Sequence, residues 1–161
     1  MIFLTVGTEQ FDFDRMVEAA DRLAIALADE EVFIQIGTNR RCPNHAQWER
    51  WLSYEGFVQR IEDARIVVTH AGAGSLLSCA WRKKVAVAMP RRQEYGEHVD
   101  NHQVEFAQRM AAMGHALIAE TPEELCALVV DYNSQLGSPE PSSALGSPLV
   151  ESLKTWLAEG S

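Results

Sequence analysis

The segment THAGAGS, residues 69–75, places two glycines and a serine between two apolar stretches. RIVVT before it is typical of a buried strand and LLSCAW after it of a helix, so the small residues stand where a strand turns into a helix. The first turn of a helix has unpaired N–H groups and a partial positive charge, which bind anions. Gly72 and Gly74 remove side chains that would block a phosphate, and Ser75 adds a hydroxyl. This spacing suits a diphosphate; a tight turn whose glycines serve only packing is the alternative.

A second small-residue turn, Gly7-Thr8, follows the apolar run at residues 2–6. Its hydroxyl could hold another phosphate oxygen or cap a helix, and the residues alone leave both open. Neither turn is the dinucleotide fingerprint, because HAGAGS lacks the pattern G-x-G-x-x-G and follows the fourth expected strand instead of the first.

The segment EYGEHVDNHQ is dense in polar groups. His98 and His102 are four residues apart, as in a helical metal pair, but Val99 stands where a metalloprotease motif needs glutamate, so we expect no metal site. Asn101, His102 and Gln103 supply amide and imidazole groups able to bond sugar hydroxyls. A polar helix start with Asp100 near its N-cap is the alternative.

Other side chains with chemical potential lie at or near expected strand ends. His70 ends a strand, where it could be a hydrogen-bonded structural residue or a catalyst. Arg91 and Arg92 follow the fifth expected strand and could meet a phosphate or a sugar carboxylate, or remain solvated. Trp48 and Trp51 could stack on a base, although packing in a core or an interface is the favoured interpretation.

The elements that must position these residues follow from apolar periodicity and turn residues. The expected strands are residues 2–6, 31–37, 56–58, 65–69, 85–90 and 116–119. The expected helices are 13–27, with Asp12 or Asp14 as N-cap, then 74–83, 100–113 and a last one after Thr121, while 38–53 reads as a loop with a short helix. This alternation predicts an α/β, Rossmann-like parallel sheet with helices on both faces. Ligands of such sheets lie at the carboxyl ends of the strands, where the polar turns converge.

Bulk properties narrow the functional class. The 161 residues fit one domain, with a Ser/Pro/Gly-rich linker at 134–148 between the domain, 1–133, and a short amphipathic helix at 149–161. The net charge of −9 argues against nucleic-acid binding. Three cysteines in no zinc spacing indicate reduced thiols and a cytoplasmic location. We expect neither a signal peptide nor a membrane span, and the terminal helix to fold back or dock on a partner.

Three motifs in this order, FLTVGTEQFD, VVTHAGAGSLL and GEHVDNHQVEFA, resemble the carboxyl-terminal nucleotide-sugar-binding half of the family 28 glycosyltransferases. The resemblance covers residues 1 to about 130. It is strongest to stand-alone versions of that half, namely bacterial exopolysaccharide subunits of the PssE type and the catalytic subunit of the two-part GlcNAc transferase for dolichol-linked oligosaccharides.

The resemblance implies one half of a GT-B fold and a hexosyltransferase that is active only with a partner chain. The partner would be a membrane-anchored, acceptor-binding subunit, the donor a UDP-sugar carrying a hexose or hexuronic acid, and the acceptor a lipid-linked saccharide. It implies no cofactor and no metal, and a position at the inner face of the membrane through the partner. The general base would belong to the partner, with His70 and His102 as the candidates in this chain.

The resemblance also assigns roles to individual positions. The diphosphate would be held by Gly72, Ala73, Gly74 and Ser75, beside Gly7 and Thr8, while Asn101, His102 and Gln103 would face the donor sugar, and Arg91 or Arg92 could pair with a glucuronic acid carboxylate. Ser78 stands where many relatives carry a glutamate that grips the ribose, so ribose recognition is expected to be weaker, water-mediated or shifted elsewhere. The competing hypotheses are a non-catalytic module that activates a partner transferase, a UDP-sugar epimerase-like enzyme, and a plain Rossmann cofactor binder.

Overall fold

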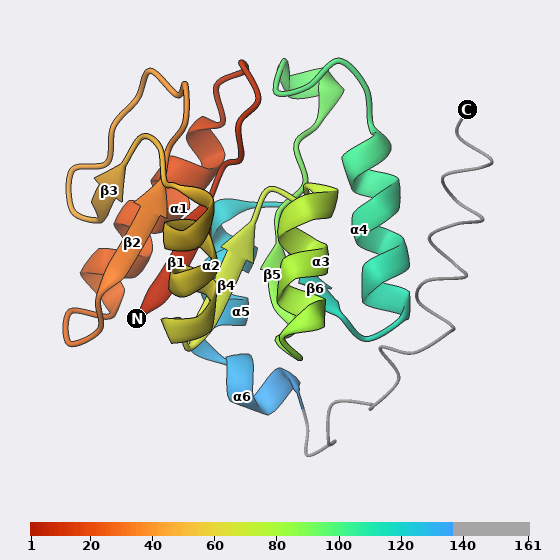
Figure 1. Ribbon diagram of the computed structural model, residues 1–161. Coiled ribbons are helices and arrows are strands. Elements are labelled where there is room, and N and C mark those ends of the chain that lie inside the picture. Colours follow the sequence, from red (N-terminus) through yellow and green to blue (C-terminus); the bar gives the residue numbers. More distant parts are fainter. Residues whose placement is uncertain (137–161) are drawn as a thin grey trace.

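The computed structural model describes residues 1–136 as a six-stranded sheet in the order β3-β2-β1-β4-β5-β6 (Figure 1). Every strand pair is parallel. The strands are β1 Ile2–Thr5, β2 Val32–Gln35, β3 Gln47–Glu49, β4 Ile66–Thr69, β5 Ala86–Ala88 and β6 Ala116–Ile118. The predicted α/β class with an all-parallel, Rossmann-like sheet is confirmed.

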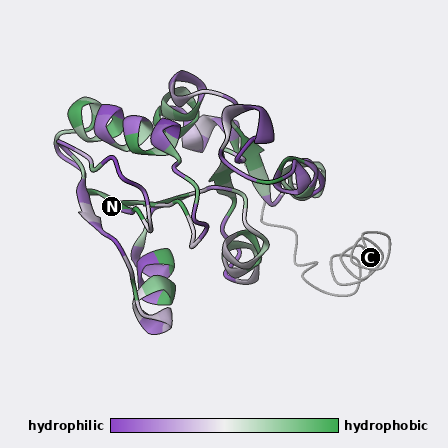
Figure 2. Cartoon of the chain, turned by 90° about the horizontal axis from the view of Figure 1, so that it is seen from above, coloured by the Kyte–Doolittle hydropathy of each residue, from purple (hydrophilic) through white to green (hydrophobic). Residues whose placement is uncertain are grey.

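Helices cover both faces of the sheet, as the view from above shows (Figure 2). They are α1 Asp14–Ala26, α2 Tyr54–Asp63, α3 Ala73–Trp81, α4 His102–Ala112, α5 Pro122–Val130 and α6 Tyr132–Gln135, with a 3-10 turn, η1, at Gln93–Tyr95. One face packs Leu4 of β1 against α1 and α5, and the other packs Phe3 against α2, α3 and α4. Because both faces are buried, the central strands are apolar at nearly every position, without the alternation of a half-exposed strand.

The third strand lies in a different place from the prediction. GFV, residues 56–58, is part of α2, whose N-cap Ser53 accepts a hydrogen bond from Gly56 N at 3.0 Å. The strand is instead Gln47–Glu49, within the segment expected to hold a loop and a short helix. All three of its residues are exposed at the sheet edge, so it carries no apolar pattern. The prediction failed because a short apolar run fits a strand and a helix equally well.

Helix starts agree with the sequence in one case and differ in another. Thr121 caps α5 as expected, accepting from Glu124 N at 3.2 Å. The N-cap of α1 is Phe13, not Asp12 or Asp14. Asp12 instead accepts a hydrogen bond from Arg40 N at 2.8 Å. Its carboxylate therefore ties the start of α1 to the β2–β3 connection.

The predicted domain limit falls near the end of the described chain. Residues 134 and 135, expected to open the linker, belong to α6 and Leu136 is its C-cap, while residues 137–148 of the linker and the helix at 149–161 lie outside the described residues. Within residues 1–136, no helix has the length and apolar character that a membrane span needs.

Candidate functional site

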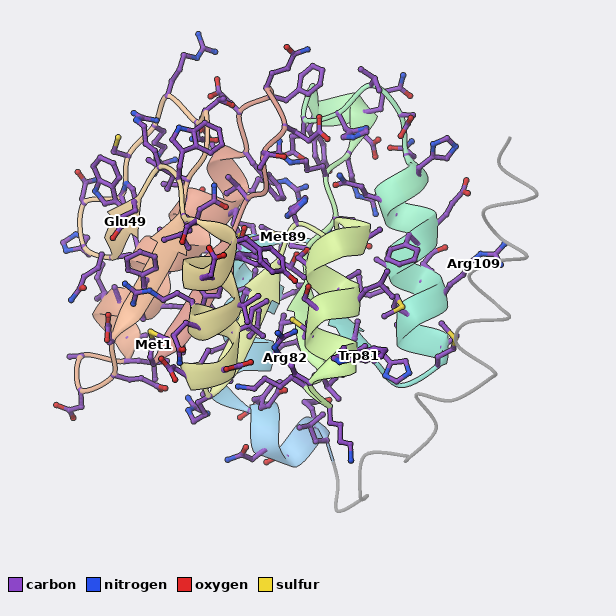
Figure 3. The ribbon with its side chains drawn as sticks, viewed as in Figure 1. Met1, Glu49, Trp81, Arg82, Met89 and Arg109 are labelled. Atoms are coloured by element: carbon purple, nitrogen blue, oxygen red, sulfur yellow. The ribbon has the colours of Figure 1, made fainter. Side chains whose placement is uncertain are left out.

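A cavity of about 500 Å³ opens at the carboxyl edge of the sheet, where β1 and β4 end and α2 and α3 begin. Its lining is Thr5, Gly7, Thr8, Gln35, Trp51, Leu52, Ser53, Tyr54, Phe57, His70, Gly72, Gly74, Ser75 and Ser78. None of these described lining residues is an acid, a lysine or an arginine, so the cavity wall carries no fixed charge. Trp81 and Arg82 lie at the other end of α3, away from this edge (Figure 3).

The two small-residue turns meet in this cavity because their strands are neighbours. Thr5 of β1 pairs in register with Thr69 of β4, so Gly7-Thr8 and the turn at 70–75 leave the sheet side by side. The cavity thereby gathers six predicted binding residues from two distant segments, Gly7, Thr8, Gly72, Gly74, Ser75 and Ser78. Ala73 is the first residue of α3.

The start of α3 presents backbone N–H groups to the cavity. Gly72 is the N-cap, and within the described chain no side chain caps this helix and no acid occupies its first turn. The N–H groups of Ala73 and Gly74 therefore have no partner inside the helix and remain available. A β-carbon on Gly74 would meet no atom within 4 Å, so the space above the turn is open.

Ser75 lines the cavity, and its hydroxyl is also used by the fold. It donates to Gly72 O at 2.9 Å and lies 2.5 Å from the Thr69 hydroxyl, which in turn donates to it. Ser75 is 6% exposed. Its main contribution is to hold the turn, and the backbone amides carry the capacity to bind an anion.

His70 lies between the two turns. A β-carbon on Gly7 or on Gly72 would come within 3.0 Å of His70 Nε2, closer than real β-carbons approach. His70 Nδ1 lies 3.3 Å from Thr5 O, and since a carbonyl only accepts, Nδ1 carries the proton and Nε2 is bare. Burial, with a contribution from the charge of Arg91, lowers the pKa of His70 to about 3. The ring is neutral near pH 7 and is a weak candidate for the general base.

A second network fixes Gly7, which has a positive φ of 79°. Gly7 N donates to Thr5 Oγ1 at 3.2 Å, and Gln35 Nε2 donates to Gly7 O at 3.1 Å. The Thr5 hydroxyl donates to Gln35 Oε1 at 2.6 Å and closes the network. Sequence analysis missed Gln35; the available signal was a polar residue that ends an otherwise apolar strand.

Aromatic side chains form the wall opposite α3. Trp51, Tyr54 and Phe57 line the cavity. Trp51 is 51% exposed and Trp48 is 40% exposed, so neither tryptophan packs in the core, and packing in an interface stays a prediction. Only their tertiary placement separates the two residues: Trp51 faces the cavity from the segment before α2, and Trp48 belongs to the edge strand β3.

The sequence model of the glycosyltransferase family 28 C-terminal domain matches residues 1–147. The chain belongs to this family. The human UDP-N-acetylglucosamine transferase subunit ALG13 is 27% identical over 168 residues, which cover 99% of this chain and 14% of the human protein.

Solved glycosyltransferases share the fold. MurG from Acinetobacter baumannii matches with a TM-score of 0.54 and 26% identity, over 83% of this chain and 42% of that one. The glycotransferase of kitacinnamycin matches with a TM-score of 0.62 and 22% identity, over 86% and 35%. The family 28 domain described here thus spans less than half of either enzyme, as expected for one half of a GT-B fold.

The two arginines that the family resemblance offered to the donor lie elsewhere. Arg91 is fully buried, with its guanidinium on backbone carbonyls. Arg92 pairs with Glu120 and, at 3.2 Å, with Glu94. Neither lines the cavity, so their proposed contact with a sugar carboxylate is not supported by their placement.

The Asn101–Gln103 segment begins α4 at the same edge of the sheet but outside the cavity lining (Figure 1). Asn101 Oδ1 accepts a hydrogen bond from Gln93 N at 3.0 Å, and His102 is exposed with Nδ1 3.1 Å from Asp100 Oδ2. Gln103 Oε1 is buried without a partner among the described residues. In the described part of this family 28 domain, no three His, Cys, Asp or Glu side chains are grouped as a metal site would require.

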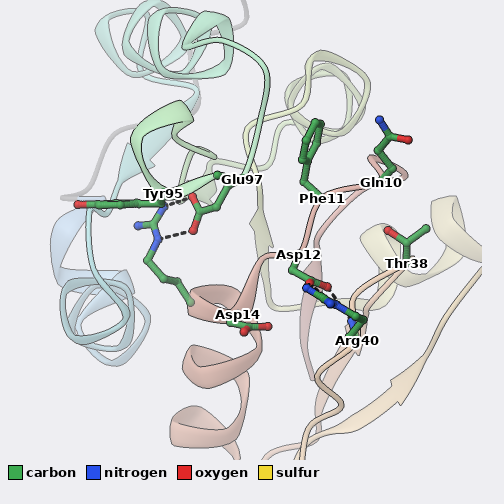
Figure 4. A pocket seen from close by; sticks show the side chains of 10 residues that line it. Gln10, Phe11, Asp12, Asp14, Thr38, Arg40, Tyr95 and Glu97 are labelled. Carbon is green, nitrogen blue, oxygen red and sulfur yellow. Dashed lines mark hydrogen bonds and ion pairs between the residues drawn. The ribbon is translucent and has the colours of Figure 1, made fainter.

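A larger hollow of about 810 Å³ lies on the other side of the β1–α1 loop (Figure 4). Four of its charged residues form two ion pairs, and the fifth, Asp14, accepts a hydrogen bond from Asn39 Nδ2 at 3.0 Å. Asp12 binds Arg40 at 2.6 Å, and Glu97 binds Arg15 at 2.6 Å. Arg15 also lies 4.8 Å from the centre of the Tyr95 ring. Because these charged groups already have partners within the protein, this hollow has less capacity to bind a diphosphate than the unpaired amides of α3.

Proposed function

We propose that this family 28 domain is the donor-binding subunit of a two-component glycosyltransferase that uses a UDP-sugar. The observation that carries the proposal is the meeting of two small-residue turns, Gly7-Thr8 and Gly72–Ser75, in one cavity beside unpaired amides of α3. Helix amides and the positive end of the helix dipole favour a diphosphate, and the lining holds no carboxylate to repel it.

The uridine is proposed to occupy the aromatic side of the cavity. Trp51 offers a half-exposed ring there, and Tyr54 and Phe57 extend the apolar wall. A base stacked on such a ring gains dispersion and hydrophobic energy without needing a charged contact. Ser78, in the second turn of α3, and Ser53, the N-cap of α2, line the cavity with hydroxyl groups that are proposed to contact the ribose.

The sugar is proposed to extend from the diphosphate toward the start of α4, where Asn101, His102 and Gln103 stand. The reaction is a direct displacement in which an acceptor hydroxyl attacks the anomeric carbon, the bond to the diphosphate breaks, and UDP leaves. Amides fixed at the start of α3 stabilise the charge that develops on the leaving diphosphate. A hexose is proposed as the donor sugar, and this choice is supported by the engagement of Arg91 and Arg92, the candidates for a hexuronate carboxylate, with Val6 O and Glu120.

The acceptor half is proposed to come from a membrane-anchored partner, which would place this chain at the cytoplasmic face. The similarity to the human transferase subunit ALG13 supports an active site that is completed by a second chain. The cavity also lacks an evident base among its described residues, since His70 is the one histidine and its pKa is about 3. The acceptor is proposed to be a lipid-linked saccharide of bacterial exopolysaccharide synthesis or a related glycan.

Titration of the full chain with UDP, followed by amide NMR, tests the donor site. The largest shifts are expected at Gly72–Ser75 and Gly7-Thr8, and NAD at the same concentrations should leave these amides unmoved. Shifts confined to other surfaces would remove the assignment. Transferase assays with the chain alone and with its membrane partner test the second part; full turnover without a partner would contradict the two-component arrangement.

A further inference from the structure

Arg91 is a cation buried behind the β1–α1 turn. Its Nη2 donates to Val6 O at 2.8 Å, and its Nη1 donates to Phe11 O at 2.9 Å and to Glu97 O at 3.0 Å. The guanidinium lies 4.8 Å from the centre of the Phe13 ring. One side chain from the end of β5 therefore joins both ends of the loop that carries Gly7 and Thr8.

If Arg91 served only to pack the interior, the burial of its charge would lower the stability of the fold. Arg91 is 0% exposed, and within residues 1–136 its hydrogen bonds go to backbone carbonyls, while its Nε has no partner. The nearby Glu97 carboxylate binds Arg15 and the backbone N of Arg92 instead. Removing an ion from water costs free energy, and an apolar residue of similar volume is often more stabilising. Burial also lowers the pKa of Arg91 to about 10, which leaves it charged near pH 7.

The position of Arg91 connects it to the candidate donor site in two ways. Val6 O belongs to the peptide group that leads into Gly7, so the bond from Arg91 restrains this turn from one side while Gln35 restrains it from the other. The charge of Arg91 also acts on His70, which lines the cavity. The carboxylates of Glu97, Glu9 and Asp12 offset part of the Arg91 charge. Because the cavity wall carries no fixed charge, no group in that wall opposes the remaining positive field at a bound anion.

We propose that Arg91 is a positioning residue for the donor, which holds Gly7-Thr8 beside the start of α3 and supplies positive charge to the diphosphate without touching it. This inference rests on the proposed function, because it takes the cavity to be the diphosphate site. It replaces the direct contact between arginine and donor that the sequence suggested.

The test compares Arg91→Met and Arg91→Lys with wild type. Arg65→Met is the matched control, because Arg65 forms a bidentate pair with Glu30 outside the cavity lining. NMR titration gives the affinities for UDP and for uridine, and amide exchange reports on Gly7 and Thr8. For Arg91→Met we expect UDP to bind at least tenfold more weakly and the affinity for uridine to fall by a smaller factor. Amide exchange at Gly7 and Thr8 should be faster than in wild type. Arg65→Met should resemble wild type in all three measurements.

The UDP-to-uridine ratio separates a charge effect from a packing effect, because a merely structural role would weaken both ligands alike. Arg91→Lys keeps the charge but loses the planar set of guanidinium donors. Its ratio of UDP affinity to uridine affinity should therefore be closer to that of wild type than the ratio of Arg91→Met is. Amide exchange at Gly7 and Thr8 should still be faster than in wild type. If Arg91→Met does not fold, Arg91→Lys decides: wild-type exchange and wild-type UDP affinity in it overturn the proposal. A wild-type chain that binds no UDP would instead refute the proposed function, with the exchange comparison still reporting on the turn.

Discussion

The imidazole of His70 occupies the space that a β-carbon on Gly7 would need, since such a carbon would lie under 3.0 Å from His70 Nε2. Gly72 stands in the same relation to the ring. Both turns therefore pack against the same imidazole, and the absence of side chains at both positions is what allows them to meet at the cavity.

Gly7→Ala is expected to destabilise the fold by about 3 kcal/mol or more, because it adds a clash with His70 to the cost of a positive φ. Gly114→Ala is the matched control: its φ of 77° is close to the 79° of Gly7, and a β-carbon there would meet nothing within 4 Å. That variant should lose only about 1–2 kcal/mol. Urea unfolding measures both, and equal losses would show that His70 does not constrain Gly7.

Gly74→Asp should separate stability from binding. The new side chain has open space, and a carboxylate in the first turn of a helix stabilises it by about 0.3–1 kcal/mol. The same carboxylate would repel a diphosphate, so UDP binding should be lost while the midpoint of urea unfolding stays the same or rises.

Gly74→Asn supplies the control for Gly74→Asp, because it has nearly the same shape without the charge. Calorimetric titration with UDP should show that Gly74→Asn retains most of the affinity that Gly74→Asp loses. If Gly74→Asp binds UDP as wild type does, the diphosphate does not lie at the start of α3.

Trp51→Ala and Trp48→Ala form a matched pair of half-exposed tryptophans. Trp51 lines the cavity and Trp48 does not, so only Trp51→Ala should weaken UDP binding, by about 1–3 kcal/mol if the base stacks on the ring. UDP affinity and intrinsic fluorescence quenching check this. Equal effects from the two variants would place the base elsewhere.

The burial of His70 makes stability depend on pH. Its pKa falls from 6.5 in the unfolded chain to about 3 in the folded one, so between these values only the unfolded chain binds the proton. Stability from this residue is therefore complete above about pH 6.5 and declines as the pH falls, by about 2 kcal/mol at pH 5. Urea unfolding measures the free energy of unfolding at pH 7 and at pH 5. The decrease between these two pH values should be about 2 kcal/mol smaller in His70→Asn than in wild type.

The His70 ring can also be observed directly by imidazole ¹⁵N shifts. At pH 5 they should report a neutral ring with the proton on Nδ1, held by Thr5 O. A protonated ring at that pH would contradict both the burial and the assigned tautomer.

Local sequence was sufficient for most of the architecture. Apolar runs such as IFLT and IVVT predict strands buried on both faces, because they lack the polar alternation of a half-exposed strand. The small residues around Gly72 predict the turn from strand to helix. It was insufficient for Gln47–Glu49, an exposed edge strand whose pairing partner, and not its composition, makes it a strand.

What the sequence by itself determined is the parallel sheet, the edge at which the ligand turns lie, and the small residues that leave α3 open. Only the tertiary structure decided that Arg91 is buried under the β1–α1 turn, that the Ser75 hydroxyl serves the fold, and that Trp51 faces the cavity. The physical reason is the distance along the chain over which each property is determined. Strand and turn preferences arise from neighbouring residues, whereas burial of a cation or exposure of an aromatic ring depends on segments that meet only when the chain folds.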